Sequence, residues 1–381
     1  MIYIDLSYFM RHQRITGVPR VILEFVRRFL ESDLPVCYLY DESLQQEYTV
    51  LSHKVVAQKC NNYTHMRRLS GYPKFSLSAC TADDILLDLD WQDRRHFVLP
   101  QLKVQNTKIA AFVHDLIPFY YPEDTEAELG GNNIITFIGA HVQYADLLLT
   151  GSNTTAEDLS SLQKTLALPP VPIKVIGLGC NYTILDDRMN GKNKYGRYLL
   201  AVGTIEPRKN IDLLVAAFEN ELVQNTDLNL VLVGKIGWIS NEFRDKLLNH
   251  AQLNKRIFVL TGVSDEQLAT LYEQAYLYVF LSKTEGYGLP LVEALAHGTV
   301  ALVSDISIFR ELGGTYCEYF SLHHSASDLA VKIRNLYDEP KHYQALKQSL
   351  STYRPLSWDE AFANLCRALK QMRETDNEGS N

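Results

Sequence analysis

The chain has 381 residues, of which 46% are hydrophobic and 22% charged, with a formal net charge of -8. This length exceeds what one hydrophobic core usually holds, so two globular domains are expected. There is no run of about 18 apolar residues, no basic signal-peptide start and no Cys-x-x-Cys pair among the six cysteines, which argues against a membrane span, export, a zinc site or a disulfide framework. We therefore expect a protein of the reducing cytoplasm, with no nucleic-acid partner.

The first forty residues predict a strand, a helix and a second strand, which is a βαβ opening. The strands are MIYIDLS (1–7) and LPVCYLY (34–40), and the helix is GVPRVILEFVRRFL (17–30). Apolar side chains recur on one face of this helix at Ile22, Phe25, Val26 and Phe29. Gly17 at the helix start can present a backbone amide to an anion, although a plain helix-start glycine explains it equally well.

Residues 51–80 carry basic side chains and no acidic ones, interleaved with aromatic and sulfur-containing residues. The members are Lys54, Lys59, Arg67, Arg68 and Lys74, with Tyr63, Met66, Tyr72 and Phe75. This segment is predicted to be a loop that lies on an anionic bilayer or holds an anionic acceptor. A solvated loop is the alternative.

Further apolar runs end in polar or glycine residues, as expected for parallel strands whose carboxyl ends lie at one edge of a sheet. They are DDILLDLDW (83–91), KIAAFVHDLIP (108–118), DLLLTGSN (146–153) and IKVIGLG (173–179). Within the second run, His114 ends the strand KIAAFV, which places its imidazole at the sheet edge. A purely structural histidine is the alternative.

A second strand-helix alternation begins at Tyr198, after a polar segment at 181–196 that reads as a linker. In it, Arg208 and Lys209 stand between the strand LLAVGT and the helix NIDLLVAAF. Their charges would lie at the carboxyl edge of a sheet near a helix start, where they can stabilise a diphosphate. A surface pair in a loop is the alternative.

The segment KTEGYGLPLVEALAHG (283–298) follows an apolar strand at 277–282 and predicts a glycine turn and then a short helix at 290–297. Glu293 is expected in the first turn of this helix, and Glu285 just before it. A strand, a glycine turn and a helix start together suit an anion or a polyol. Glutamates that only cap and solvate a helix are the alternative.

Several segments in this order resemble the donor domain of family 4 of the retaining GT-B glycosyltransferases, and bacterial mannosyltransferases in particular. They are LLAVGTIEPRKNIDLLVAAF (199–218), LNLVLVGKIGW (228–238), RIFVLTGVSDEQLATLYEQA (256–275) and the E-x7-E segment with GTVALVSD (298–305). The resemblance implies an α/β GT-B fold, with two Rossmann-like domains facing a central cleft. Residues 1–185 would bind the acceptor, residues 195–355 the donor, and an amphipathic helix at 358–374 would cross back to the first domain.

The resemblance also implies roles for individual residues. Arg208 and Lys209 would bind the donor phosphates, Glu293 the ribose hydroxyls, and Glu285 the transferred sugar, with His114 as a further sugar contact. Backbone groups near the donor would come from Gly17, Gly203, Gly286, Tyr287, Gly288 and Leu289. Neither a metal nor a cofactor is expected. One departure is Thr204, where many relatives carry a basic residue.

The expected function is transfer of a hexose from a nucleoside-diphosphate sugar to a hydroxyl of a glycan or lipid-linked acceptor in surface polysaccharide synthesis. GDP-mannose is the first candidate for the donor and a UDP-hexose the second, and peripheral contact with an anionic membrane is expected. One alternative is a non-catalytic nucleotide-sugar-binding subunit. Another is a metal-dependent GT-A transferase that uses Asp88-Leu89-Asp90, and a dehydrogenase is disfavoured because no G-x-G-x-x-G follows the first strand.

Overall fold

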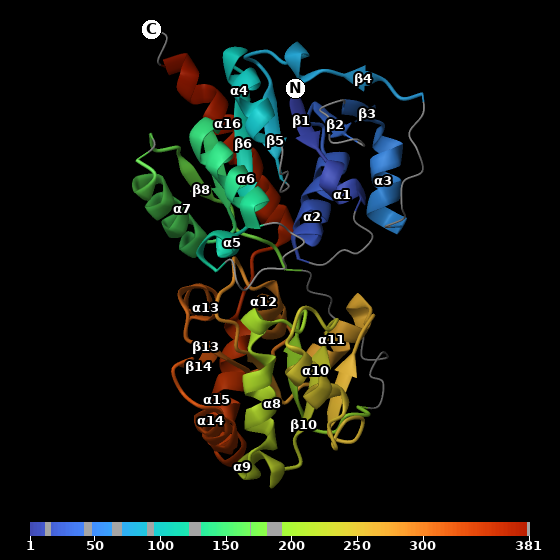
Figure 1. The fold of residues 1–381 in the computed structure, drawn as a ribbon, viewed down its shortest axis with the longest axis vertical. Helices are drawn as coiled ribbons and strands as arrows, with labels where there is room; N and C mark the ends of the chain where they lie inside the picture. The colour runs from blue at the N-terminus through green and yellow to red at the C-terminus, as the bar shows by residue number, and fades with distance from the viewer. Residues whose placement is uncertain are drawn as a thin grey trace. The chain divides into compact units, whose positions relative to one another are not determined.

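The chain folds into two compact units, each with its own sheet and hydrophobic core (Figure 1). The computed structural model describes residues 1–11, 17–41, 48–62, 71–89, 95–121, 131–167, 169–180 and 193–378. The first unit holds Met1–Gly179 and Leu356–Asn381, and the second holds Cys180–Pro355. The division falls directly before the segment that was interpreted as a linker, most of which lies outside the described residues.

In the described residues, the sheet of the first unit has the strand order β4-β3-β2-β1-β5-β6-β7-β8. The strands are Ile2–Asp5 (β1), Val36–Tyr40 (β2), Tyr48–Leu51 (β3), Lys74–Phe75 (β4), Ile85–Asp88 (β5), Lys108–Val113 (β6), Leu147–Thr150 (β7) and Ile173–Val175 (β8). The six strands predicted from apolar runs are confirmed, and they pair in parallel. β3 pairs antiparallel with β2 and β4, and neither β3 nor β4 was predicted, because such short strands show little alternation.

Helices pack against this sheet, and the predicted helix at 17–30 is confirmed. Those in the described residues are Ser7–Arg11 (α1), Val18–Glu31 (α2), His53–Asn62 (α3), Arg95–Val104 (α4), Ile117–Tyr120 (α5), Gly131–Tyr144 (α6), Asn153–Thr165 (α7) and Trp358–Glu378 (α16), with a 3-10 turn at Leu77–Ala79 (η1). All four apolar side chains expected on the inner face of α2 are buried. The helical period of the sequence therefore identified the face that packs on the sheet.

The C-terminal helix α16 belongs to the first unit, where it contacts α2. The ring of Phe29 meets that of Phe362 edge-on, with centroids 4.9 Å apart. Arg28 donates a hydrogen bond to Asp359 at 2.7 Å. The amphipathic segment predicted at 358–374 thus returns to the first half of the chain, and its helix runs past the predicted end.

The basic segment at 51–80 is not the single loop that was predicted, because it contains α3 and β4. Lys59 is only 1% exposed, and its ammonium lies 5.9 Å from the centre of the Phe9 ring, so it is not placed to meet a bilayer. Lys54 and Lys74 are exposed. The other basic residues and two of their neighbours lie outside the described part of the chain: Tyr63, Met66, Arg67 and Arg68. α3 buries only a narrow apolar stripe, which explains why its periodicity was too weak to predict a helix.

The second unit contains a parallel sheet with the strand order β11-β10-β9-β12-β13-β14. Its strands are Tyr198–Val202 (β9), Asn229–Val233 (β10), Ile257–Leu260 (β11), Leu277–Phe280 (β12), Ala301–Ser304 (β13) and Cys317–Phe320 (β14). Strands that follow β9 in the chain first extend the sheet on one side and then, from β12, on the other. The order therefore reverses between β9 and β12, and ligands of open parallel sheets bind at such a point.

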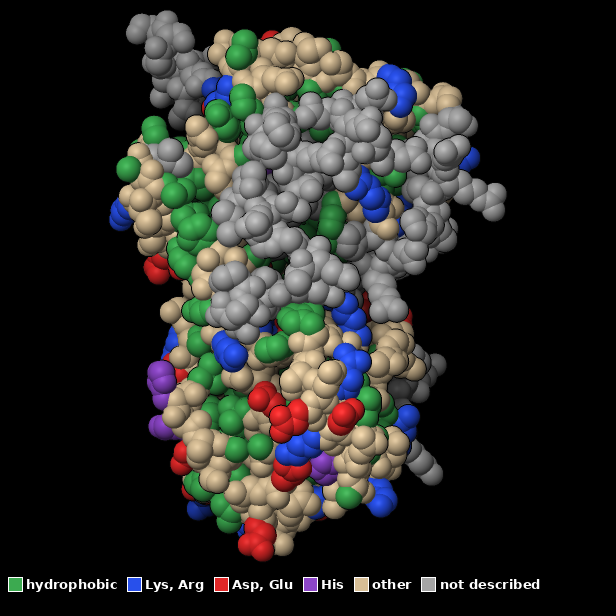
Figure 2. All heavy atoms as spheres, in the orientation of Figure 1, with side chains coloured by type: hydrophobic (Ala, Val, Ile, Leu, Met, Phe, Trp, Pro, Cys, Tyr) green, Lys and Arg blue, Asp and Glu red, His purple; other side chains and the backbone are tan. Residues whose placement is uncertain are grey.

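The helices of the second unit connect these strands or, as α14 and α15, follow the last of them. They are Ile211–Glu219 (α8), Glu221–Gln224 (α9), Asn241–Leu248 (α10), Asp265–Gln274 (α11), Leu289–Ala296 (α12), Ser307–Gly313 (α13), Ala326–Asp338 (α14) and Pro340–Ser349 (α15), with 3-10 turns at Pro207–Lys209 (η5) and Leu350–Thr352 (η6). On the face shown in Figure 2, acidic and basic side chains of this unit are interspersed. Pairs of this kind, such as Lys246 with Glu219 at 2.7 Å, are partly exposed and contribute little to stability.

Candidate functional site

The loops after β9 and β12 meet at the point where the strand order reverses. The loop after β9 carries Arg208 and Lys209, and the loop after β12 carries Glu285. The backbone N–H of Lys283 donates to the carbonyl of Arg208 at 2.9 Å, and the side-chain amide of Asn210 donates to the carbonyl of Leu281 at 3.0 Å. These two bonds hold the loops together, so side chains that are about 76 positions apart in the chain become neighbours.

One carboxylate oxygen of Glu285 interacts with three neighbouring side chains. Its Oε1 accepts from the ammonium of Lys209, lies 2.8 Å from a guanidinium nitrogen of Arg208, and accepts from the hydroxyl of Ser282 at 2.7 Å. The other terminal nitrogen of Arg208 donates to Oε1 of Glu206 at 2.6 Å. Two cations and two carboxylates thus form one nearly buried cluster, with side-chain exposures between 5% and 15%.

The charges in this cluster shift one another's proton affinity. Burial opposes the ionisation of Glu285, but the charges of Arg208 and Lys209 and the bonds that it accepts outweigh burial and lower its pKa to about 2. Burial lowers the pKa of Lys209, although Glu285 opposes this. Burial raises the pKa of Glu206. Glu285 therefore remains a carboxylate at any pH at which the protein is used.

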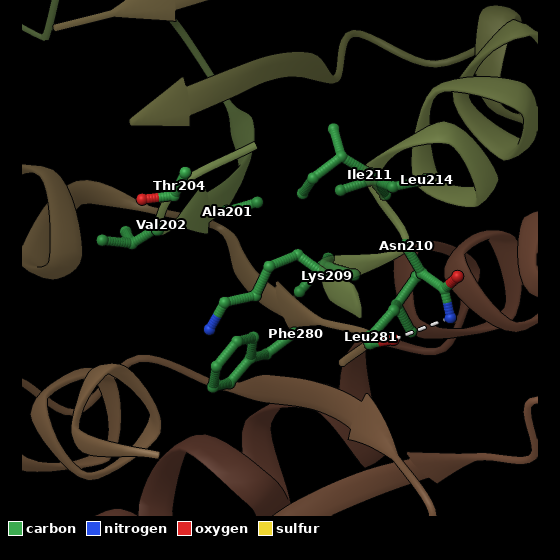
Figure 3. Close-up of a pocket in the computed structure, with 11 residues that line it drawn as sticks. Ala201, Val202, Thr204, Lys209, Asn210, Ile211, Leu214, Phe280 and Leu281 are labelled. Atoms are coloured by element: carbon green, nitrogen blue, oxygen red, sulfur yellow. Dashed lines mark hydrogen bonds between the residues drawn. The ribbon is translucent and has the colours of Figure 1, made fainter. Parts of the chain in front are cut away.

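A small pocket opens beside Lys209 (Figure 3). Its walls come from the ends of β9 and β12 and the start of α8, and they are mostly apolar. In Figure 3 the Lys209 chain extends along the Phe280 ring, and its ammonium lies 4.7 Å from the ring centre. Gly203 has a φ of +137°, which favours glycine, and a Cβ there would only be in ordinary contact with the Lys209 chain, at 3.4 Å. The N–H of Gly203 already donates to the carbonyl of Val233 at 2.8 Å, so this amide is paired within the sheet edge.

The glycine turn at 286–288 leads into α12. Gly288 has a φ of +94°, which favours glycine, and a Cβ there would lie 3.0 Å from the Phe309 ring. Helix α12 begins at Leu289, one residue earlier than predicted, so Glu293 lies in its second turn and not in the first. The Glu293 side chain is nearly buried, and its Oε2 accepts from the hydroxyl of Tyr272 at 3.3 Å. Gly286 and Tyr287 lie between the Glu285 cluster and the start of α12.

Two of the predicted residues, Gly17 and His114, belong to the first unit. Gly17 precedes α2 with a φ of +60°, and the space where its Cβ would lie is open. His114 follows β6 as predicted, but it is only 9% exposed, and its Nε2 lies 3.0 Å from the carbonyl of Leu89. Because a carbonyl only accepts, Nε2 carries the proton. Burial lowers the pKa of His114 to about 4, so its imidazole is neutral near pH 7.

The first aspartate of the Asp-x-Asp triplet, Asp88, is shielded from solvent. Asp88 is fully buried, and its Oδ2 lies 2.9 Å from Nε2 of the equally buried His141. Asp90 lies outside the described residues. Among the described residues, no three His, Cys, Asp or Glu side chains group as metal ligands. Asp88 is thus part of a buried pair that fastens β5 to α6.

Several side chains of the site were not predicted from the sequence. Glu206 and Ser282 bond directly to the Arg208 and Glu285 cluster, and Tyr272 bonds to Glu293. A polar residue at the end of a buried strand is a usable signal, and Ser282 fits it. Glu206 and Tyr272 carry no such signal, because a glutamate in a loop and a tyrosine in a helix are usually explained by solvent and by packing.

The low pKa of His114 predicts an acid-sensitive stability. The folded state favours the neutral imidazole, and the unfolded chain takes up a proton near pH 6.5, so the free energy of unfolding should fall as the pH drops from about 6.5 to about 4. The full contribution of His114 is about 3 kcal/mol. Urea unfolding of His114→Gln should show a flatter pH dependence in this window. The exposed His323 serves as control, and an equal flattening in His323→Gln would contradict the assignment.

The second unit matches a known protein family. Residues 185–350 fit the sequence model described as "Glycosyl transferases group 1". This part of the second unit is thus similar to a glycosyl transferases group 1 domain. This domain contains both cluster loops and α12, so Arg208, Lys209, Glu285 and Glu293 all lie within it.

The chain is also similar in sequence to bacterial mannosyltransferases. The serotype-specific mannosyltransferase WbdA of Escherichia coli is 29% identical over 370 residues, which cover 89% of this chain and 42% of that protein. The O-antigen chain mannosyltransferase RfbU of Salmonella typhimurium is 30% identical over 218 residues, or 57% of this chain and 56% of that protein. The chain thus spans about two fifths of the length of WbdA. The predicted resemblance to bacterial mannosyltransferases is confirmed.

The chain also matches solved structures that are remote from it in sequence. The Anabaena protein Alr3699/HepE, in complex with UDP and glucose, superposes with a TM-score of 0.66 at 13% identity, and the match covers 97% of this chain and 99% of that one. At this identity the likeness shows the fold alone. The predicted GT-B fold class is confirmed.

Proposed function

We propose that this chain is a glycosyltransferase that moves a hexose from a nucleoside-diphosphate sugar to a hydroxyl of a glycan or lipid-linked acceptor in surface polysaccharide synthesis. The observation that carries the proposal is the buried cluster of Arg208, Lys209 and Glu285 at the strand-order reversal of a group 1 domain. Two cations that face a carboxylate at such a point suit a diphosphate joined to a sugar.

In the proposed reaction, the acceptor oxygen forms a bond to the anomeric carbon as the bond from that carbon to the diphosphate breaks. The acceptor proton passes to an oxygen of the leaving diphosphate on the same face, which retains the configuration. Arg208 and Lys209 stabilise the charge that develops on this diphosphate, and the Glu285 carboxylate stabilises the positive charge on the sugar. Glu293 accepts bonds from the ribose hydroxyls, because a carboxylate can hold two hydroxyls at once.

The donor is proposed from the relatives and not from the geometry. The relatives named above are mannosyltransferases, which makes GDP-mannose the first candidate. The structural neighbour holds UDP and glucose, so a UDP-hexose is the second. None of the helices in the described residues is long and apolar enough to cross a membrane. We place the protein in the cytoplasm, with peripheral membrane contact, and we expect the transfer to need no metal ion.

A panel of nucleotide sugars tests the proposal. The full chain should be stabilised against heat by one of GDP-mannose, UDP-glucose and UDP-galactose, since a bound ligand raises the melting temperature. In the absence of an acceptor, the protein should also release the corresponding nucleoside diphosphate slowly. The rate of this release should be the same with and without excess chelator. NMR of the product sugar reports whether the anomeric configuration is retained. Tight binding without turnover on any acceptor would instead favour a non-catalytic nucleotide-sugar-binding subunit, and loss of activity in chelator that manganese restores would favour a metal-dependent enzyme.

A further inference from the structure

A tyrosine from α11 contacts the carboxylate that is proposed to bind ribose. The hydroxyl of Tyr272 donates to Oε2 of Glu293 at 3.3 Å. The exposed fractions of the two side chains are 1% and 5%, so little water competes for this bond. α11 and α12 are neighbouring helices of the same unit, and this bond joins their inner faces.

Three contacts hold Tyr272 in place, two to its ring and one to its backbone. It stacks on the His297 ring with centroids 5.8 Å apart and an interplanar angle of 13°. It meets the Tyr278 ring edge-on at 5.7 Å. The hydroxyl of Thr299 donates to the Tyr272 carbonyl at 2.5 Å, which holds the backbone. These contacts fix the orientation of the ring, and in this orientation its hydroxyl points toward Glu293.

Tyr278 provides an internal comparison, because it is also a buried phenol beside the same site. It lies on β12 and is fully buried, and its hydroxyl has no hydrogen-bond partner in the described part of the chain. Burial, together with the charges of Glu285 and Glu293, raises the pKa of this phenol well above its ordinary value. Tyr272 and Tyr278 are thus two neighbouring buried phenols, and only the hydroxyl of Tyr272 has a described bond to Glu293.

We propose that Tyr272 is a positioning residue, whose hydroxyl holds the Glu293 carboxylate in the orientation that accepts the ribose hydroxyls. The inference rests on the proposed function, because it assumes that Glu293 binds ribose. A carboxylate on a helix can rotate about its side-chain bonds, and a fixed donor on one oxygen limits that rotation.

The test compares Tyr272→Phe with Tyr278→Phe in the full chain. Calorimetry measures the binding of GDP and of 2′,3′-dideoxy-GDP, which lacks both ribose hydroxyls, or of the UDP pair if the panel identifies a UDP-sugar. Tyr272→Phe should weaken GDP binding roughly five- to tenfold, as expected for the loss of one hydrogen bond to a charged group, and should leave dideoxy-GDP binding unchanged. Tyr278→Phe removes a hydroxyl that has no hydrogen-bond partner among the described residues. It should therefore leave the affinities for GDP and for dideoxy-GDP unchanged.

The dideoxy nucleotide separates positioning from a general loss of structure. If Tyr272→Phe weakens both nucleotides equally, or if Tyr278→Phe weakens GDP as much, the ring and not the hydroxyl matters, and the inference is wrong. If Glu293→Gln weakens GDP binding but Tyr272→Phe does not, the proposed function stands and the inference alone fails. If the wild-type chain binds neither nucleotide pair, the proposed function fails, and the inference fails with it.

Discussion

Replacing Glu285 by glutamine is expected to lower kcat at least a hundredfold, with little change in the donor KM. The carboxylate is proposed to stabilise positive charge that develops on the sugar only in the transition state, and removing one such preorganised group costs about 10²- to 10³-fold. The substitution also removes the charge that pairs with Arg208 and Lys209, so a lower melting temperature should accompany the kinetic loss. Steady-state kinetics and thermal unfolding of the same preparation measure both effects.

Glu318 supplies the matched control for this substitution. It is also a partly buried glutamate paired with two basic side chains, Lys332 at 2.6 Å and His342 at 2.7 Å, but it lies on β14, outside the cluster. Glu318→Gln should keep its kcat. If the two variants lose activity equally, the effect of Glu285 is one of folding. Because the pKa of Glu285 is about 2, its contribution to stability is present above about pH 4.5 and is lost as the pH falls toward 2.

Replacing Lys209 by methionine is expected to weaken GDP binding about 10- to 100-fold. A charge-assisted bond to a phosphate oxygen contributes about 1.5–3 kcal/mol, and methionine keeps the length of the chain along the Phe280 ring without the charge. GMP lacks the second phosphate, so its binding should change far less. Titration calorimetry of the two nucleotides with the same variant gives the comparison.

Lys332→Met in the same unit controls for the loss of one positive charge, because Lys332 pairs with Glu318 outside the cluster. It should leave the affinities for GDP and GMP unchanged. An equal loss for both nucleotides in Lys209→Met would place the lysine against another part of the ligand and would contradict its proposed role. Lys209→Arg should not restore wild-type affinity, since a planar guanidinium donates in a different geometry from a compact ammonium.

Much of the fold was predictable because the relevant signals are local. Apolar runs with polar ends identified β1, β2 and β5 to β8, and the helical period identified the buried face of α2 and the C-terminal helix. The signals failed where an element is short or weakly amphipathic, as in β3, β4 and α3. The start of α12 was misplaced by one residue, which moved Glu293 from the first turn to the second. Helix ends are decided by competing caps, and these are weak compared with burial.

By itself, the sequence determined the residue types at the site and the strand and helix on either side of each. It placed Arg208 and Lys209 after one strand and Glu285 after another, since a strand, a loop and a helix follow from spacing and side-chain type over a dozen residues. Only the tertiary structure decided that Arg208 and Lys209 share one carboxylate oxygen of Glu285, that the N–H of Gly203 is taken by Val233, and that Tyr272 bonds to Glu293. These contacts join residues 21 to about 76 positions apart, and no local pattern encodes them. The cluster exists only once the parallel sheet brings the ends of β9 and β12 together, and the Tyr272 bond only once α11 packs beside α12.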